Sequence, residues 1–295
     1  MRGNLAPVLQ LDIGKEAFIS ADQATGDQGL SKVHSLNLST TRTKSMTQPT
    51  AAMIVIGDEI LSGRTRDSNA HYLANVLTEA GISLREVRMI ADEHDVIVAT
   101  VNALRGQVDH VFTSGGIGPT HDDITADGVA AAFGDHIDVR EDARALLEAA
   151  YAKRGMEINE ARLRMARIPD SATLIDNPVS TAPGFTIGNV HVMAGVPAVF
   201  VEMVKSVVAS IEGGPKLLSW AFRCRIGEGD LAGPLGKCAK MFPNVSMGSY
   251  PFGGGAGAVL ILRHADRAHL SDAADALRKA LAPLGGAEDE TPPET

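Results

Sequence analysis

From residue 52 onward, short apolar runs alternate with segments of helical periodicity. The run Ala52–Ile56 is apolar throughout, which is typical of a parallel strand that is buried on both faces. Apolar residues then recur at offsets 0, 3, 4 and 7 counted from Ala70, which indicates one face of a helix. Successive strand–helix units predict an α/β fold with a doubly wound, mostly parallel sheet and helices on both sides.

The same patterns predict the other elements of this domain, which we place at residues 49–213. Strands are expected at Leu84–Ile90 and Val108–Thr113, and helices over about 96–104, up to about 133, over about 141–154 and over about 198–211. Phe185–Ile187 and Val190–Met193 are expected to form a hairpin around Gly188-Asn189.

A turn sequence, Gly213-Gly214-Pro215, marks a boundary before a second unit at residues 216–285. Its order of strand, helix, strand, strand and helix predicts a small α+β unit. Residues 286–295 are acidic and Pro-rich, and residues 1–48 are polar with weak periodicity, so we expect both segments to be disordered. Because the regular pattern begins after Met46, this residue is a candidate for the physiological start.

The chain carries a net charge of −9, and 44% of its residues are apolar. This apolar content is enough for a full core, and the acidic balance disfavours binding to a nucleic-acid backbone. No window reaches the roughly 18 apolar residues of a membrane span, and no secretory signal is apparent. We therefore expect a cytoplasmic protein with no membrane and no nucleic-acid partner. Cys224 and Cys238 fit no zinc-ligand spacing and are expected to be reduced thiols.

A glycine-rich loop, TSGGIGPTHDDIT at Thr113–Thr125, joins a predicted strand to a predicted helix. Ligands of open α/β sheets bind beyond the carboxyl ends of the strands, and the free N–H groups of the next helix attract anions. The loop therefore predicts a ligand site, although a tight turn without a ligand would use the same glycines. The candidate ligand-binding residues here are Ser114, Gly115, Gly116, Gly118, Pro119 and Thr125.

The acidic end of this loop has two interpretations. Asp123 follows Thr120 at the spacing of a capping box, in which its carboxylate would only satisfy a backbone N–H. Alternatively, Asp122 and Asp123 hold a divalent cation beside a bound phosphate, because carboxylates and substrate phosphates are the usual ligands of magnesium. His121 is interpreted as a loop residue rather than as a metal ligand.

A second segment, GDEILSG at 57–63, follows the first predicted strand and should face the same crevice, unless it is only a solvated loop. With one polar residue of the next helix, its candidate ligand-binding residues are Gly57, Asp58, Glu59, Gly63 and Asn69. Asp92 stands at another strand exit, either as the N-cap of the following helix or as a catalytic carboxylate. Acids from two strand exits, such as Asp92 and Asp123, could clamp one metal or activate a nucleophile.

Four ordered motifs resemble those of a known family. They are GDEILSGRTRDSN (57–69), TSGGIGPTHDDIT (113–125), NPVSTAPGF (177–185) and MAGVP (193–197). The resemblance is to the molybdopterin-binding fold of the MoaB and MogA proteins. It is closer to the N-terminal part of competence/damage-inducible protein A (CinA) and to the matching domain of eukaryotic FAD synthases. Because the second unit, with GSYPF at 248–252, also looks CinA-like, the resemblance covers about residues 50–285.

The resemblance implies a sheet that binds a pterin or a nucleotide diphosphate over the glycine loop. In the molybdopterin adenylyltransferases, two acids assist magnesium-dependent chemistry, and their positions fall on Asp92 and Asp123. The GPTHDD sequence differs from that of the adenylyltransferases and favours the CinA and FAD-synthase branch, whose members are associated with cleavage of ADP-ribose or FAD pyrophosphate bonds. The resemblance includes neither an amidase nor a nucleotidyltransferase domain, so nicotinamide-mononucleotide deamidation and FAD synthesis are not expected.

Three functional hypotheses follow from these residues, and the expected ligand is a molybdopterin or an adenine nucleotide. In the first, the protein is a nucleotide pyrophosphatase that uses Mg²⁺, Mn²⁺ or Co²⁺ held near Asp92, Asp122 and Asp123. In the second, it is a non-catalytic module of molybdenum cofactor metabolism that binds a molybdopterin-type ligand. In the third, it is an assembly platform that has lost its ligand. The resemblance also implies a homo-oligomer, either a dimer or a trimer.

Overall fold

The computed structural model describes residues 48–293. The predicted N-terminal extension therefore lies, apart from Gln48, outside the described residues. No helix within 48–293 is both long enough and apolar enough to cross a membrane.

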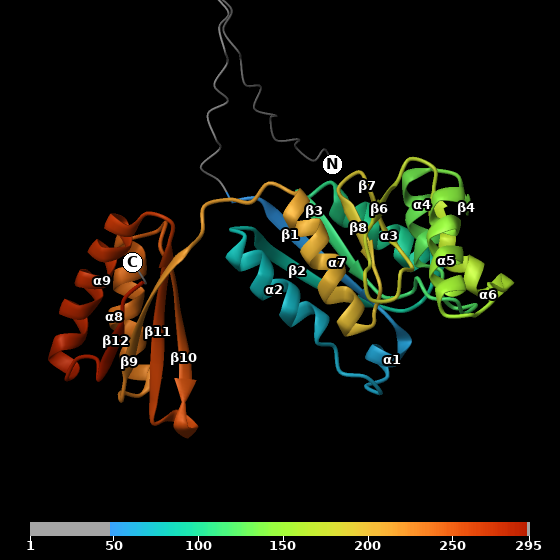
Figure 1. The fold of residues 1–295 in the computed structure, drawn as a ribbon. Helices are drawn as coiled ribbons and strands as arrows, with labels where there is room; N and C mark the ends of the chain where they lie inside the picture. The colour runs from blue at the N-terminus through green and yellow to red at the C-terminus, as the bar shows by residue number, and fades with distance from the viewer. Residues whose placement is uncertain (1–47, 294–295) are drawn as a thin grey trace, which may run out of the picture. The chain divides into compact units, whose positions relative to one another are not determined.

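A six-stranded sheet forms the centre of the first domain, with the strand order β2-β1-β3-β8-β7-β6 (Figure 1). The first four strands in this order run parallel, and β7 and β6 are antiparallel to their neighbours. The strands are β1 (Thr50–Ile56), β2 (Ser83–Ile90), β3 (His110–Ser114), β6 (Thr173–Ile175), β7 (Gly184–Ile187) and β8 (Val190–Met193). The predicted α/β fold with a mostly parallel sheet is confirmed, and so is the β7–β8 hairpin.

Helices cover both faces of this sheet (Figure 1). Their bounds, with those of a small separate β4–β5 pair, are α1 (Asp58–Leu61), α2 (Asn69–Glu79), α3 (His94–Arg105), α4 (Thr125–Phe133), β4 (Ile137–Val139), α5 (Glu141–Lys153), α6 (Glu160–Leu163), β5 (Arg167–Pro169) and α7 (Pro197–Ser210). Both faces are apolar, which is why β1 has no polar alternation.

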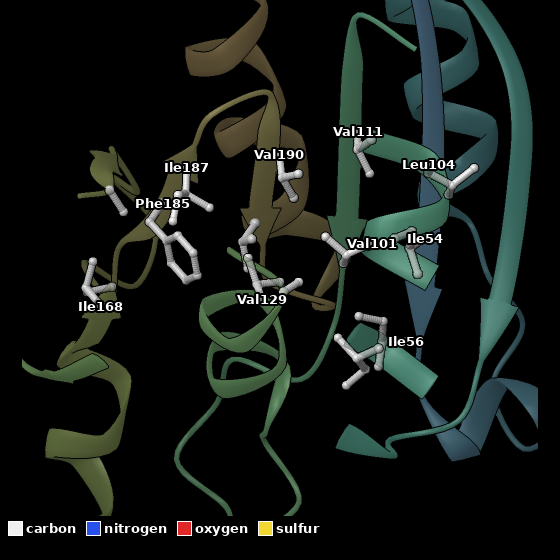
Figure 2. Packing of buried hydrophobic residues seen from close by; sticks show 14 of the residues in the cluster. Ile54, Ile56, Val101, Leu104, Val111, Val129, Ile168, Phe185, Ile187 and Val190 are labelled. Atoms are coloured by element: carbon white, nitrogen blue, oxygen red, sulfur yellow. The ribbon is translucent and has the colours of Figure 1, made fainter. Parts of the chain in front are cut away.

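Successive residues of β1 enter two different cores. Ile54 and Ile56 pack with residues of α3, α4 and α5, where Val101 and Val129 are fully buried (Figure 2). Met53 lies on the opposite face, in the core that α2 and α7 cover. The sheet is therefore held on both sides, and the loops at its strand ends rest on a rigid support.

The second unit is an α+β sandwich, as predicted. Its antiparallel sheet has the order β10-β11-β9-β12, and both of its helices contribute to one core. The elements are β9 (Leu218–Cys224), α8 (Glu228–Met241), β10 (Ser246–Phe252), β11 (Gly257–His264), α9 (Arg267–Leu281) and β12 (Asp289–Thr291). Cys224 and Cys238 are buried free thiols in this core.

The prediction of a disordered tail from residue 286 is wrong for the described part of that segment. Residues 289–291 form β12, an edge strand that pairs antiparallel with β9. The acidic residues of the tail have arginine partners: Glu288 lies 2.7 Å from Arg225, and Glu290 lies 2.7 Å from Arg278. The composition alone shows the negative charges but not the arginines that β9, its following turn and α9 bring beside them.

The contact between α3 and α4 provides a test of the packing. An ideal β-carbon at Gly128 would lie 2.7 Å from Cγ2 of Ile97, a buried β-branched side chain that has no room to withdraw. We predict that Gly128→Ala lowers the free energy of unfolding by about 1–3 kcal/mol, measured by urea denaturation.

The matched control is Gly236→Ala within α8, where an added β-carbon meets no heavy atom within 4 Å. There the higher helix propensity of alanine should raise the free energy of unfolding by about 0.5–1 kcal/mol. If Gly128→Ala also raised the free energy of unfolding, this result would contradict the tight contact between α3 and α4.

Candidate functional site

Four strand ends border a cleft of about 620 Å³, which we call the strand-end cleft. Its lining includes Gly57 after β1, Asp92 after β2, Gly115 after β3 and Gly195 after β8. The volume is that of a small-molecule site. The crevice expected from the two glycine segments and Asp92 is present, and the connection from β8 to α7 adds a wall that the sequence analysis did not assign.

At Gly115 the backbones at the ends of three strands come into direct contact. Its φ is 108°, and an added β-carbon would lie 2.1 Å from the carbonyl oxygen of Ile56. Its N–H donates to the carbonyl of Met193 at 3.1 Å. An ideal β-carbon on Gly195 would lie 3.2 Å from the Gly115 Cα. No residue with a side chain fits at position 115. The close packing of the backbone itself therefore requires glycine here.

Two further glycines leave room for polar side chains beneath the loop. A β-carbon at Gly116 would lie 2.1 Å from Thr125 Oγ1, and one at Gly118 would lie 2.7 Å from Asp123 Oδ2. Thr125 is fully buried, and its hydroxyl is without a hydrogen-bond partner among the described residues. The Thr125 N–H donates to the Gly116 carbonyl at 2.9 Å, so the loop and the first turn of α4 form one packed unit.

Asn69 ties the loops together from below the cleft. Its side-chain amide donates to Ser114 Oγ at 2.7 Å and to the carbonyl of Gly195 at 2.8 Å. Asn69 and Ser114 are both buried, so these bonds are shielded from water. They join the start of α2 to the ends of β3 and β8. The two residues therefore position the cleft rather than line it.

Asp92 does not cap α3, which corrects one of the two interpretations of this residue. The N-cap is Glu93, and it makes no side-chain capping bond. One oxygen of the Asp92 carboxylate instead accepts the Asp58 N–H at 2.9 Å. Partial burial raises the pKa of Asp92, and the nearby acids Asp58, Glu59 and Asp122 raise it further, while the bond from the Asp58 N–H lowers it.

Asp123 makes the hydrogen bonds expected from the first interpretation and also lines the cleft. Its carboxylate accepts the Thr120 N–H at 2.8 Å and also the Thr120 hydroxyl, as in a capping box. Because α4 begins only at Thr125, however, this bond closes the loop and does not cap the helix. Asp123 also lines the strand-end cleft, together with Asp122. The side chain of His121 is 99% exposed and lies outside the cleft lining, in agreement with its interpretation as a loop residue.

The charged residues that line the cleft are all acidic. Its lining includes four acidic residues, Glu59, Asp92, Asp122 and Asp123, and none of its lining residues is Lys, Arg or His. The start of α7 also lies at the cleft, because its N-cap Val196 and its first residue Pro197 are part of the lining.

The predicted site residues fall into three groups: those that line the cleft, those that support it and one that lies outside it. Those that line the strand-end cleft are Gly57, Glu59, Asp92, Gly115, Gly116, Gly118, Pro119, Asp122 and Asp123. Asn69, Ser114 and Thr125 lie behind this lining as supports, and Asp58 contributes its N–H to Asp92. Gly63 is in a turn with φ 72°, is exposed, and is not part of the cleft lining.

Sequence reasoning did not assign several residues that line the cleft. They are Thr65, Met165, Asn177, Ser180, Ala182, Val196, Pro197 and Val199. The motifs at 177–185 and 193–197 were recognised as turn sequences. Their turn residues could have indicated that these segments line the cleft. Asn177 forms a turn in which its amide donates to Ser180 Oγ at 2.6 Å and to the carbonyl of Ala182 at 2.8 Å.

The donor set fits a cation that arrives with a phosphorylated ligand. Within residues 48–293, no three His, Cys, Asp or Glu side chains stand close enough together to hold a metal ion. Magnesium is usually held by one or two carboxylates together with substrate phosphates and water. Asp92 and the acids of the loop supply such carboxylates, whereas a resident structural metal would need a closed set of protein ligands.

These features define the class of protein: an open α/β sheet with a glycine-lined cleft at the carboxyl ends of its parallel strands. Residues 52–213 match the family model described as a probable molybdopterin binding domain, and the chain belongs to this family. Residues 216–286 match the middle domain of FAD synthase. The family resemblance stated from the motifs is thus confirmed.

Individual relatives agree with this assignment. A protein of Aeropyrum pernix is 31% identical over 260 residues, which cover 82% of this chain and 97% of that protein. A probable FAD synthase of Caenorhabditis elegans is 35% identical over 236 residues, which cover 71% of this chain and 45% of that protein. The chain thus matches less than half of that relative.

Among solved structures, the protein CinA from Thermoplasma acidophilum, described as of unknown function, is 36% identical. The match covers 55% of this chain and 97% of that structure, with a TM-score of 0.51.

The environment of Asp92 predicts a gain in stability on neutralisation. Because folding raises the pKa of this carboxyl, the folded protein holds its proton more tightly than the unfolded chain does, and stability falls as the pH rises through that interval. Asp92→Asn carries no charge and keeps an oxygen for the Asp58 N–H. We therefore expect Asp92→Asn to melt at a higher temperature than the wild type at pH 7.

The difference between the two melting temperatures should shrink as the pH falls, and it should vanish below the ordinary aspartate pKa of 3.8, where Asp92 is protonated in both states. Thermal melts from neutral to acidic pH measure it. A lower melting temperature for Asp92→Asn at pH 7 would mean that the charge-assisted bond to Asp58 outweighs desolvation.

Proposed function

We propose that the strand-end cleft binds the diphosphate of a nucleotide or pterin together with a divalent cation, and that the protein hydrolyses the pyrophosphate bond of ADP-ribose or FAD. The observation that carries this proposal is the charge of the cleft, which has four carboxylates and no basic residue in its lining. A free diphosphate would be repelled there, whereas a diphosphate with Mg²⁺, Mn²⁺ or Co²⁺ would be attracted.

The backbone supports the same ligand chemistry. The loop at Gly115–Gly118 has no side chains beyond Ile117, so a ligand can approach its peptide groups directly. Phosphate oxygens could therefore be held by the backbone amides of the glycine loop, while the cation balances the carboxylates.

The proposed reaction adds water across one bond. The water oxygen forms a bond to one phosphorus, the bridging P–O bond breaks, and ADP-ribose yields AMP and ribose 5-phosphate. A divalent cation, when bound, neutralises phosphate charge and polarises the phosphoryl oxygens. Asp92 is suited to take the proton of the water, because the Asp58 N–H holds one of its oxygens in place and its pKa is raised above the ordinary aspartate value, which makes the carboxylate a stronger base.

The names of relatives connect this chain with flavin dinucleotides. The C. elegans relative is named a probable FAD synthase, and the second domain of this chain matches the middle domain of such enzymes. The shared part would then act on a molecule of the size and charge of FAD.

The test is release of AMP from ADP-ribose or FAD by the purified protein with Mg²⁺, Mn²⁺ or Co²⁺, followed by chromatography. Asp123→Asn should lower kcat by about 10²-fold or more while the ligand still binds. Asp95→Asn is the matched control, because the Asp95 side chain is fully exposed on α3 and does not line the cleft. Absence of AMP with all three metals would refute the proposed hydrolysis.

A second candidate function rests on the match of residues 52–213 to a probable molybdopterin binding domain. In that case the protein binds a molybdopterin-type ligand without turnover. Asp123→Asn would then leave binding unchanged, and the wild type would raise its melting temperature with ligand but form no product.

A further inference from the structure

Val196 occupies an unusual position at the strand-end cleft. Its side chain is 62% exposed although it is a large apolar residue, and it lines the cleft. The neighbouring Gly195 approaches the backbone of Gly115, so Val196 stands one residue from the glycine loop. Its backbone is fixed, because its carbonyl accepts the N–H groups of Val199 at 3.0 Å and Phe200 at 2.9 Å.

Helix stability does not explain a valine at this position. Val196 is the N-cap of α7, where Ser, Thr, Asp or Asn would accept a free N–H of the first turn. Valine offers no such acceptor, and it buries little of its own surface. Both the fold and the solvent would therefore favour a polar residue, which points to a role for the apolar side chain toward a ligand.

Other apolar residues extend this surface. Those that line the cleft with Val196 include Ile117, Met165, Ala182, Pro197 and Val199. They line the same cleft as the carboxylates. The acidic part of the cleft lies in the connections that follow β1, β2 and β3, whereas Val196 and Pro197 lie at the β8–α7 connection. None of the residues that line it is aromatic.

We propose that Val196 and Pro197 form the subsite that contacts the planar ring of the ligand, and that Val196 determines how tightly ring-bearing diphosphates bind. This inference rests on the proposed function, which places the diphosphate at the acidic part. A molecule with a charged diphosphate and a flat heteroaromatic ring matches both parts of the cleft at once. Aliphatic contact without aromatic stacking discriminates weakly between ring types, so a purine and a pterin should both be accepted.

The experiment compares ligands with and without a ring. Isothermal titration in the presence of Mg²⁺ gives Kd values for ADP, for neopterin triphosphate and for methylenediphosphonate, which has two phosphorus centres but no ring. Val196→Ser should weaken binding of the two ring-bearing ligands by about tenfold and leave methylenediphosphonate unchanged. Because serine is a preferred N-cap, the melting temperature should be equal to that of the wild type or higher.

The matched control is Val139→Ser, the same substitution at a 38% exposed valine of β4 that does not line the cleft. It should bind all three ligands as the wild type does. If Val196→Ser loses affinity for only one of the two ring-bearing ligands, the subsite is assigned to the ring of that ligand, and the expected acceptance of both rings is wrong.

Two results would overturn the inference in distinguishable ways. Val196→Ser could bind ADP and neopterin triphosphate as tightly as the wild type does, or it could lose as much affinity for methylenediphosphonate as for the two ring-bearing ligands. Either result would mean that the ring does not lie on Val196, although the diphosphate site would stand. If the wild type binds none of the three ligands with Mg²⁺, the proposed function fails and the subsite fails with it.

Discussion

The close approach of Gly115 to the Ile56 carbonyl and to Gly195 is the constraint on which the rest of the site depends. It joins the ends of β1, β3 and β8 without any side chain between them, and the Gly115–Met193 hydrogen bond holds this arrangement. The Asn69 amide secures it from below. Only with the backbones this close can acids from separate loops border one cleft of ligand size.

Three energetically unfavourable features of the first domain lie at this cleft. Asp92 is partly desolvated among other carboxylates, Thr125 buries a hydroxyl without a partner in the described chain, and α7 starts at a valine that cannot cap it. Elsewhere the sheet is covered by continuous apolar cores on both faces. Local costs that cluster at one place are typical of a binding or catalytic site, whose groups are arranged for a ligand and not for stability.

Elements with a strong local signal could be predicted, and those that depend on distant partners could not. The apolar run at Ala52–Ile56 and the glycine loop were assigned correctly, because burial on both faces and positive φ leave direct marks on residue type. The tail at 286–293 was misjudged, since its glutamates are neutralised by arginines remote in sequence. Asp92 was left between two roles, because the N–H that it accepts belongs to Asp58, the first residue of α1, which is remote from Asp92 in sequence.

By itself the sequence determined the parallel α/β architecture, the two domains and the strand exits at which polar residues gather, because periodicity and glycine placement are local consequences of backbone geometry. Only the tertiary structure decided which of those residues share a cleft. It placed Gly63 outside, assigned Asn69 and Ser114 to support, and added the wall at Val196 and Pro197. The physical reason is that strand order brings β8 next to β3, and pairing between strands separated by about 80 residues leaves no mark on either one alone.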